Sequence, residues 1–209
     1  KGFVDGKDSG VYAATPLTRL NVSDDMPSPK AREHFIKLYE TLGSRKVNGR
    51  YQPVHHRLVT HWARLVELLY AAEHMLELAE DPDITSTHTR DLPTKGVNPN
   101  GGVGIVEAPR GTLTHHYEAD EKGVLTKVNL IVGTTNNHAP ISMSIKRAAE
   151  KLIKKGVVVT EGLLNQIEMA FRLYDPCFSC ATHALPGQMP LVITIRDPRG
   201  ETLQVMQRD

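Results

Sequence analysis

One segment of the chain, HHRLVTHWARLVELLYAAEHMLELAE from His55 to Glu80, has apolar residues at every third or fourth position. This spacing predicts an amphipathic helix with one apolar stripe. The stripe consists of Leu58, Trp62, Leu65, Val66, Leu69, Ala72, Leu76 and Ala79. At about 1.5 Å of rise per residue the helix would be about 40 Å long. A helix of that length is expected to organise a bundle.

A shorter helix is predicted on the N-terminal side of this segment. Ser28 fits an N-cap with Pro29 in the first helical position, and the helical spacing lasts until Gly43. Its apolar positions are Phe35, Leu38, Tyr39 and Leu42. Residues 49–53 are expected to form a break between the two helices. From Phe3 to about Pro29 no period is sustained, which predicts an extended, irregular lead-in.

The C-terminal part of the chain alternates short strands with helices. Runs rich in Val, Ile, Leu and Thr predict an antiparallel sheet, and helical spacing returns after it. The strands are expected at 103–108, 111–117 and 124–132, the helices at 141–155 and 160–174, and a hairpin at 190–205. Residues 81–102 are polar and predict a surface loop. The predicted fold class is α+β, a helix-rich bundle with small antiparallel sheets, helical over 28–80 and 138–175 with the sheet over 103–132.

The composition excludes several classes of protein. The 209 residues are 40% hydrophobic and 23% charged with a formal net charge of +1, which is unlike a disordered or polybasic chain and argues against nucleic-acid binding. No apolar run approaches the roughly 18 residues of a membrane span, and the N-terminus has no apolar signal core. A cytoplasmic protein is therefore expected. Because the chain begins with Lys1 rather than Met, we expect a processed chain or part of a longer one.

Two cysteines lie close together in the pattern Cys177-x-x-Cys180-x-x-His183. Two are too few for a disulfide framework or a four-cysteine metal site, so a metal here needs further ligands. The spacing fits a metal site, a thiol redox pair or ordinary packing. A thioredoxin-like pair should follow a strand, whereas this one follows a predicted helix. Pro176 disfavours helical backbone in Asp175, which predicts a corner there.

Two further segments place polar residues at the corners of the predicted sheet. In EAPRGTL, from Glu107 to Leu113, an acid and an arginine flank a proline, and the pattern alone favours a surface salt bridge. In GTTNN, residues 133–137, a strand ends among small hydrogen-bonding residues, which by itself is typical of a capped loop. Neither segment assigns a function on its own.

Taken together and in this order, the three segments resemble the large subunit of nickel-iron hydrogenases. The matching motifs are Glu107-Ala-Pro-Arg110-Gly-Thr-Leu, Thr134-Thr-Asn-Asn137 and Asp175-Pro-Cys177-x-x-Cys180-x-x-His183. Gly187-Gln-Met-Pro190 and Thr15-Pro-Leu-Thr-Arg19-Leu-Asn look more like the cytoplasmic branch, with its methyl-viologen-reducing and NAD-linked enzymes. The resemblance runs from near Gly10 to the end of the chain. It covers only the C-terminal part of a family member and of its fold.

The resemblance implies a role for each motif residue at a nickel-iron site. Cys177 would be a terminal thiolate on nickel, and Cys180 would bridge nickel and iron. In the family the iron carries cyanide and carbon monoxide. Arg110 and Thr134 match the positions that donate hydrogen bonds to cyanide, and Pro109 belongs to the same cofactor-binding set.

The resemblance also implies the catalytic residues, which are Arg110, Asp175 and Cys177. Arg110 corresponds to a guanidinium over the open metal position, and Asp175 would pair with it and orient it. Heterolysis of H2 needs a Lewis-acidic metal and a base, which would be the Cys177 thiolate or Arg110. His183 matches the ligand to a structural magnesium or iron ion and is the last residue of mature family members.

The chain departs from the family pattern in three respects, one being that Gly133 and Asn136 stand where many relatives have Pro and Trp. Family members have two more metal-binding cysteines in an N-terminal R-x-C-x2-C segment, and this chain has no cysteine before Cys177. It carries half of a four-thiolate site and is expected to be inactive and metal-free by itself. Residues 184–209 match an extension that a maturation endopeptidase removes after nickel insertion. The expected division is therefore 1–183 for the large-subunit part, with the metal-ligand motif at 175–183, and 184–209 for the extension.

The resulting hypothesis is a fragment of a hydrogenase large-subunit precursor. The parent would oxidise or evolve H2 with an iron-sulfur small subunit and further electron-transfer subunits as partners. One alternative is a thiol-disulfide redox protein that uses Cys177 and Cys180. Another is a non-catalytic scaffold related to the quinone-site subunit of respiratory complex I, which would have no use for the cysteines.

Overall fold

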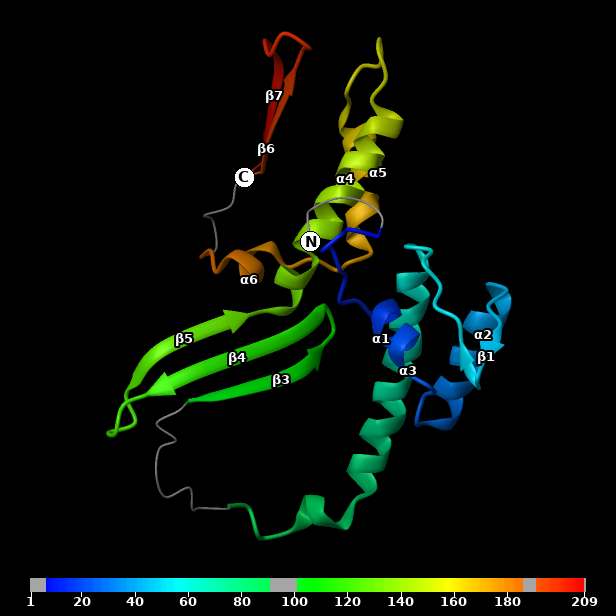
Figure 1. Ribbon diagram of the computed structural model, residues 1–209, viewed down its shortest axis with the longest axis vertical. Coiled ribbons are helices and arrows are strands. Elements are labelled where there is room, and N and C mark those ends of the chain that lie inside the picture. Colours follow the sequence, from blue (N-terminus) through cyan, green and yellow to red (C-terminus); the bar gives the residue numbers. More distant parts are fainter. Residues whose placement is uncertain (1–6, 91–100, 186–190, 209) are drawn as a thin grey trace. The chain divides into compact units, whose positions relative to one another are not determined.

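The computed structural model describes residues 7–90, 101–185 and 191–208. The chain divides into two compact units, Lys1–Pro176 and Cys177–Asp209. In their described parts the first unit contains most of the helices and two small sheets, and the second contains a short helix and a hairpin (Figure 1). The predicted α+β class, helix-rich with small antiparallel sheets, is confirmed.

The elements of the first unit alternate between helices and short strands. Its helices are α1 (Pro16–Val22), α2 (Pro29–Thr41), α3 (Val59–Glu80), α4 (His138–Leu152) and α5 (Glu161–Arg172), with 3-10 turns η1 (Pro82–Thr85) and η2 (Gly133–Asn137). Its strands are β1 (Lys46–Val47), β2 (Arg50–Tyr51), β3 (Gly102–Ala108), β4 (Gly111–Ala119) and β5 (Leu125–Ile131). The predicted surface loop thus begins with η1, and residues 91–100 lie outside the described part.

Helix α1 lies where the sequence predicts an irregular lead-in, so that prediction is wrong. The Thr15 side chain accepts a hydrogen bond from the Thr18 backbone N–H at 3.3 Å, and Pro16 occupies the first helical position. Threonine followed by proline is therefore a capped helix start. Because α1 has only 7 residues, its sequence is too short to display a helical period. The helix is stabilised instead by packing of its buried Leu17 and Leu20 into the core.

Helices α1, α2 and α3 enclose the main hydrophobic core. The long predicted helix is present, but α3 begins at Val59 rather than His55, and its 22 residues correspond to about 33 Å. The predicted apolar stripe is only partly buried, because Val66 is 1% exposed whereas Leu65 is 62% exposed. Leu58 and Leu76 of the stripe are exposed as well. The face of α3 that packs against α1 and α2 is centred on the small residue Ala63 and on Val66. Periodicity alone does not predict which face of the helix is buried.

Aromatic rings fill the centre of this core. The ring of Tyr39 stacks on that of Tyr51 at 5.0 Å between centroids and lies 4.8 Å from that of Phe35. Burial raises the pKa of Tyr39 to about 12. The Tyr51 ring is supplied by the hairpin β1–β2, which turns through Asn48 and Gly49, both with positive φ. The sequence predicts only a break here, because strands this short have no readable alternation.

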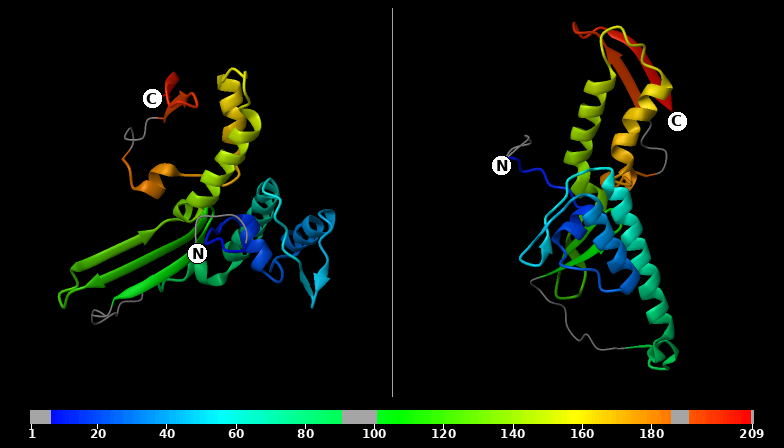
Figure 2. Two further views of the ribbon diagram at one scale, coloured as in Figure 1. Left: turned by 45° about the horizontal axis from the view of Figure 1, so that its top comes forward. Right: turned by 90° about the vertical axis from the view of Figure 1, so that its right-hand side faces the viewer.

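The sheet of the first unit has the predicted strands in the order β3-β4-β5, all antiparallel. Ala108 pairs with Gly111, so Pro109 and Arg110 form a two-residue turn between β3 and β4. After β5 the chain passes through η2 into α4, which packs against α5 (Figure 2). A second small core forms under α4 and around the end of α5, from Ile141, Leu173 and Tyr174 with Ala13, Ile145 and Phe171 against them.

The second unit contains α6 (Phe178–Thr182) and the hairpin β6 (Leu191–Arg196) and β7 (Thr202–Arg208). The predicted hairpin is confirmed for the residues described, while Gly187 and Pro190 lie outside them. Asp197 closes its turn, because one carboxylate oxygen accepts hydrogen bonds from the backbone N–H groups of Arg199 at 2.8 Å and Glu201 at 2.9 Å. No helix among the described residues is long and apolar enough to span a bilayer.

Candidate metal centre

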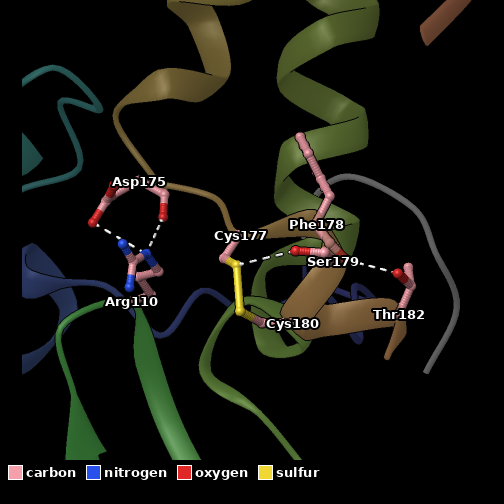
Figure 3. Close-up of a disulfide and its surroundings, with 7 residues drawn as sticks. All are labelled: Arg110, Asp175, Cys177, Phe178, Ser179, Cys180 and Thr182. Atoms are coloured by element: carbon pink, nitrogen blue, oxygen red, sulfur yellow. Dashed lines mark hydrogen bonds and ion pairs between the residues drawn. A yellow bond between two sulfur atoms is a disulfide. The ribbon is translucent and has the colours of Figure 1, made fainter. Parts of the chain in front are cut away.

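The two cysteines lie at the start of α6. Cys177 occupies the N-cap position and Cys180 lies within the helix, with 5.3 Å between their Cα atoms. Figure 3 shows their sulfur atoms joined as a disulfide. The local fold therefore brings both sulfurs to one place, as the spacing predicts. Because metals bind thiolates, the disulfide must accept two electrons before either sulfur can become a ligand.

His183 ends α6 in a left-handed conformation, with φ of 55°. The helix is closed behind it by a hydrogen bond from the Ala184 N–H to the Ser179 carbonyl at 3.2 Å. The His183 side chain is exposed. Within the described residues no three His, Cys, Asp or Glu side chains are grouped so that they could hold a metal ion.

Arg110 and Asp175 contact each other within the first unit. The Arg110 Nε–H donates to the Asp175 backbone carbonyl at 2.8 Å and lies 3.2 Å from Oδ2 of its carboxylate, as Figure 3 shows. Asp175 has a φ of 50°, a left-handed conformation that aspartate tolerates, so the predicted corner before Pro176 is present. The turn sequence favours a surface salt bridge between its own acid, Glu107, and Arg110, and that interpretation is wrong. Among the described carboxylates, Arg110 pairs with the carboxylate of Asp175.

The turn that carries Arg110 is tied to η2 by a buried asparagine. Asn137 is 0% exposed, and its side-chain N–H2 donates to the Arg110 carbonyl at 2.7 Å and to the Ala14 carbonyl at 3.1 Å. Its side-chain oxygen accepts from the Ala14 N–H at 2.9 Å. The sequence places Asn137 in a motif but gives no hint of its partners, which are distant along the chain. Thr134, in the same turn, is 2% exposed.

Arg19 of α1 contacts the same turn from another side. Its guanidinium makes a two-point ion pair with Glu67 of α3, with Nε–Oε1 and Nη2–Oε2 distances of 2.6 Å each. Its Nη1 donates to the Ala108 carbonyl at 2.9 Å. Sequence reasoning includes Arg19 in a family-like motif but assigns it no function. Pro109 is exposed at the tip of this turn, beside Arg110.

Comparison with known proteins identifies the family. A family model described as nickel-dependent hydrogenase matches residues 12–183, which includes the Arg110 turn, η2 and the cysteine pair. The chain belongs to the nickel-dependent hydrogenase family. The match ends at His183.

Named relatives agree with this assignment. The chain is 48% identical over 207 residues to an iron-sulfur subunit of the F420-non-reducing hydrogenase of Archaeoglobus profundus, an alignment that covers 99% of this chain and 40% of the relative. It is 41% identical over 203 residues to the beta subunit of the NAD-reducing hydrogenase HoxS of Cupriavidus necator, covering 97% of this chain and 40% of the relative. The chain thus spans about two fifths of the length of these curated relatives.

A solved structure is similar in fold as well as in sequence. The crystal structure of an NAD+-reducing [NiFe]-hydrogenase in the H2-reduced state superposes with a TM-score of 0.70 and 38% identity, over 85% of this chain and 37% of that one. The predicted resemblance to the hydrogenase large subunit, including its fold, is confirmed, and the redox-protein and scaffold alternatives are not favoured.

The residues of this chain fit a nickel-containing group in part. Two sulfurs at C-x-x-C spacing are soft donors suited to nickel and iron, and their Cα separation of 5.3 Å permits them to share one centre. The chain contains no other cysteine. A four-thiolate site would need two donors from elsewhere.

Proposed function

We propose that this chain is part of the catalytic large subunit of a nickel-iron hydrogenase and supplies two of the four thiolates of the nickel-iron site. The parent protein would catalyse the reversible oxidation of H2. The observation that carries this proposal is the cysteine pair, Cys177 and Cys180, in a chain whose family match includes both. Asp175, two positions before Cys177, contacts Arg110, so the chain also supplies an ion pair of the kind the family motif implies.

The proposed roles follow from the chemistry of the side chains. When bound, the nickel-iron group supplies the Lewis acidity that polarises H2. A guanidinium is always protonated in proteins, so we assign proton acceptance to the Cys177 sulfur and hydrogen-bond donation to Arg110. Asp175 orients Arg110 through its carbonyl and its carboxylate. Cys180 would hold the group beside Cys177.

Further roles are proposed for Thr134, Pro109 and His183. Thr134 and Pro109 would line the binding site together with Arg110, where cyanide and carbon monoxide ligands on iron would need hydrogen-bond donors and a dry pocket. The buried position of Thr134 is consistent with such a pocket. His183 would bind a magnesium or iron ion next to the site.

We also propose the partners of the parent protein. Relatives are named as subunits of hydrogenases, which supports an assembly of several chains. An iron-sulfur small subunit and further electron-transfer subunits would carry the electrons of H2, and the assembly would lie in the cytoplasm. Residues 184–209 would be a removable extension, since the family model ends at His183 whereas relatives align over nearly the whole chain.

The proposal is tested by measuring nickel in the full-length subunit. Cys177→Ala and Cys180→Ala should each reduce bound nickel to near zero, because each change would remove one thiolate that holds nickel and alanine offers no donor in its place. Thr182→Ala is the control, because its hydroxyl caps the Phe178 carbonyl in the same helix and is not a proposed ligand. Nickel content measured by mass spectrometry that stays at the parent level in both cysteine variants would contradict the proposal.

A further inference from the structure

Helix α3 carries two charged side chains that are linked to the segments just before Arg110 and Asp175, one through Arg19 and the other by direct contact. These side chains are Arg64 and Glu67, three residues apart and therefore on one face of the helix. Neither belongs to the motifs through which the sequence resembles the hydrogenase family.

The first contact reaches the Arg110 turn through Arg19. Glu67 holds the Arg19 guanidinium at two points of 2.6 Å, and Arg19 in turn donates to the Ala108 carbonyl at 2.9 Å. The carbonyls of Pro109 and Gly111 lie at 3.5 and 3.4 Å from the same guanidinium. One planar group thus faces the backbone on both sides of Arg110. A bidentate pair fixes the orientation of a guanidinium as well as its position.

The second contact reaches the segment that carries Asp175. Arg64 donates from Nη2 to the Leu173 carbonyl at 2.8 Å, and Leu173 is itself 2% exposed. The Arg64 Nε is buried and has no hydrogen-bond partner among the described residues. The Arg64 Nη1 also lies 3.4 Å from Nδ1 of His61. Burying an unpaired donor such as Nε is unfavourable, so the bond to Leu173 is retained here at a cost in stability.

The Arg19–Glu67 pair differs from an ordinary surface ion pair. The two side chains are only 15% and 23% exposed, and both guanidinium edges are engaged. Exposed pairs of lysine or arginine with a carboxylate are usually too solvated and too mobile to fix geometry. A half-buried, two-point pair that also binds a backbone carbonyl can do so.

We propose that Arg19, Glu67 and Arg64 are positioning residues for the Arg110–Asp175 pair, so that α3 acts as the common support of both partners. This inference rests on the proposed function, in which Arg110 donates a hydrogen bond at the metal site. Arg19 and Glu67 set the backbone from which Arg110 extends, and Arg64 sets the backbone from which Asp175 extends. Misplacement of a reacting group by about 1 Å can reduce rate about a hundredfold, so such support has catalytic consequences.

The first experiment measures H2 oxidation by the complete hydrogenase with Arg19→Ala. We expect kcat to fall at least tenfold while nickel content stays at the parent level, because Arg19 contacts the turn and no proposed metal ligand. Arg32→Ala is the matched control, since its Nε also binds a carboxylate, Asp25 at 2.7 Å, and a backbone carbonyl, Met26 at 3.2 Å. The control should change kcat by less than twofold. Arg19→Lys replaces Arg19→Ala if the latter does not assemble.

A double-mutant cycle separates positioning from general stability. If Arg19 acts through Arg110, then Arg19→Ala should lower kcat much less in an Arg110→Lys background than in the parent enzyme. If Arg19 only stabilises the fold, the two losses should multiply. Multiplying losses would overturn the inference and leave the proposed function intact. Full activity of Arg110→Lys itself would contradict the proposed function instead.

A second readout needs no activity and no metal. In the metal-free full-length subunit, hydrogen exchange of the peptide covering 106–113 should be about tenfold faster in Arg19→Ala, because a hydrogen bond from a charged donor to this turn is lost. Arg64→Ala should accelerate exchange over 171–176 in the same way. Unchanged exchange in both segments would overturn the inference, whatever the kinetics show.

Discussion

Gly111 follows Arg110 at a point where two backbone segments come too close for any side chain. Its φ is 153°, and a Cβ atom built there would overlap the carbonyl oxygen of Gly133. A Cβ on Gly133 would lie 3.3 Å from Arg110 C and Gly111 N. Two glycines therefore let β4 and η2 meet, and this close approach allows Asn137 to reach the Arg110 carbonyl.

Replacing Gly111 should accordingly strain the turn. We expect Gly111→Ala to destabilise the full-length subunit by about 1–3 kcal/mol, the usual cost of a strained backbone position. Gly104→Ala on the neighbouring strand is the matched control, because nothing lies within 4 Å of a Cβ there. Urea unfolding monitored by circular dichroism measures both. Equal midpoints for the two variants would show that the contact with Gly133 is not restrictive.

At the scale of elements, the start of α2 shows how a helix can be capped by its neighbour. Ser28 occupies the N-cap position and Pro29 the first helical position, as predicted, but the Ser28 side chain makes no capping hydrogen bond with its own helix. Glu73 of α3 caps α2 instead, accepting from the N–H groups of Lys30 at 3.1 Å and Ala31 at 3.0 Å and from the Ser28 hydroxyl at 2.6 Å. These hydrogen bonds, together with the positive end of the α2 dipole, stabilise the ionised form of Glu73.

This capping predicts how the stability of the protein depends on pH. The hydrogen bond from Ser28, followed by those from Ala31 and Lys30, lowers the pKa of Glu73 despite the opposing effect of desolvation. A lowered folded-state pKa adds stability at pH values above the unfolded-state pKa, and this stability is lost as pH falls through the folded value. The difference in melting temperature between the parent and Glu73→Gln should therefore be largest near neutral pH and shrink on acidification.

The control for this prediction is Glu33→Gln, which removes an exposed carboxylate from α2, the helix that Glu73 caps. It should lower the melting temperature less than Glu73→Gln does at neutral pH. Melting curves recorded by circular dichroism from pH 7 to pH 3 provide the comparison. A Glu73→Gln difference that is constant over this range would show that the carboxylate charge is irrelevant to the cap.

At the scale of the whole molecule, the C-terminal limit of the family match and the boundary between the two compact units lie at different residues. The family model ends at His183, whereas the second compact unit begins at Cys177 and includes the hairpin β6–β7. The cysteine pair, His183 and the proposed removable extension therefore belong to one unit. A cut after His183 would separate the hairpin from α6 without breaking any strand pairing, because β6 pairs only with β7 among the described strands.

Removal of the extension should depend on metal in the full-length precursor. We expect the maturation endopeptidase to cleave between His183 and Ala184 in the nickel-loaded precursor and to leave the metal-free precursor intact. The physical reason is that ligation of Cys177 and Cys180 would fix the segment that leads to the cut. Intact-mass measurement after incubation with the endopeptidase reports the product, and equal cleavage with and without nickel would refute metal gating.

The sequence by itself determined most of the elements and the chemistry-bearing groups. Periodicity places α2, α3, α4 and α5, and β-branched runs separated by turns place β3, β4 and β5, because these patterns follow from local geometry and from which side chains need burial. The cysteine spacing and the Arg110 turn could also be found without coordinates. Periodicity does not detect short elements such as α1 and β1–β2, because seven or fewer residues are too few to show a period.

Only the tertiary structure decided which polar partners meet. Arg19 reaches Glu67 and Asn137 reaches Ala14, pairs that are 48 and 123 positions apart in the chain. Nothing in local sequence encodes such pairs, because they follow from how α1, α3 and the β3–β4 turn pack. The buried face of α3 was decided in the same way, since a helix with apolar residues on several sides buries only the side that its neighbours cover.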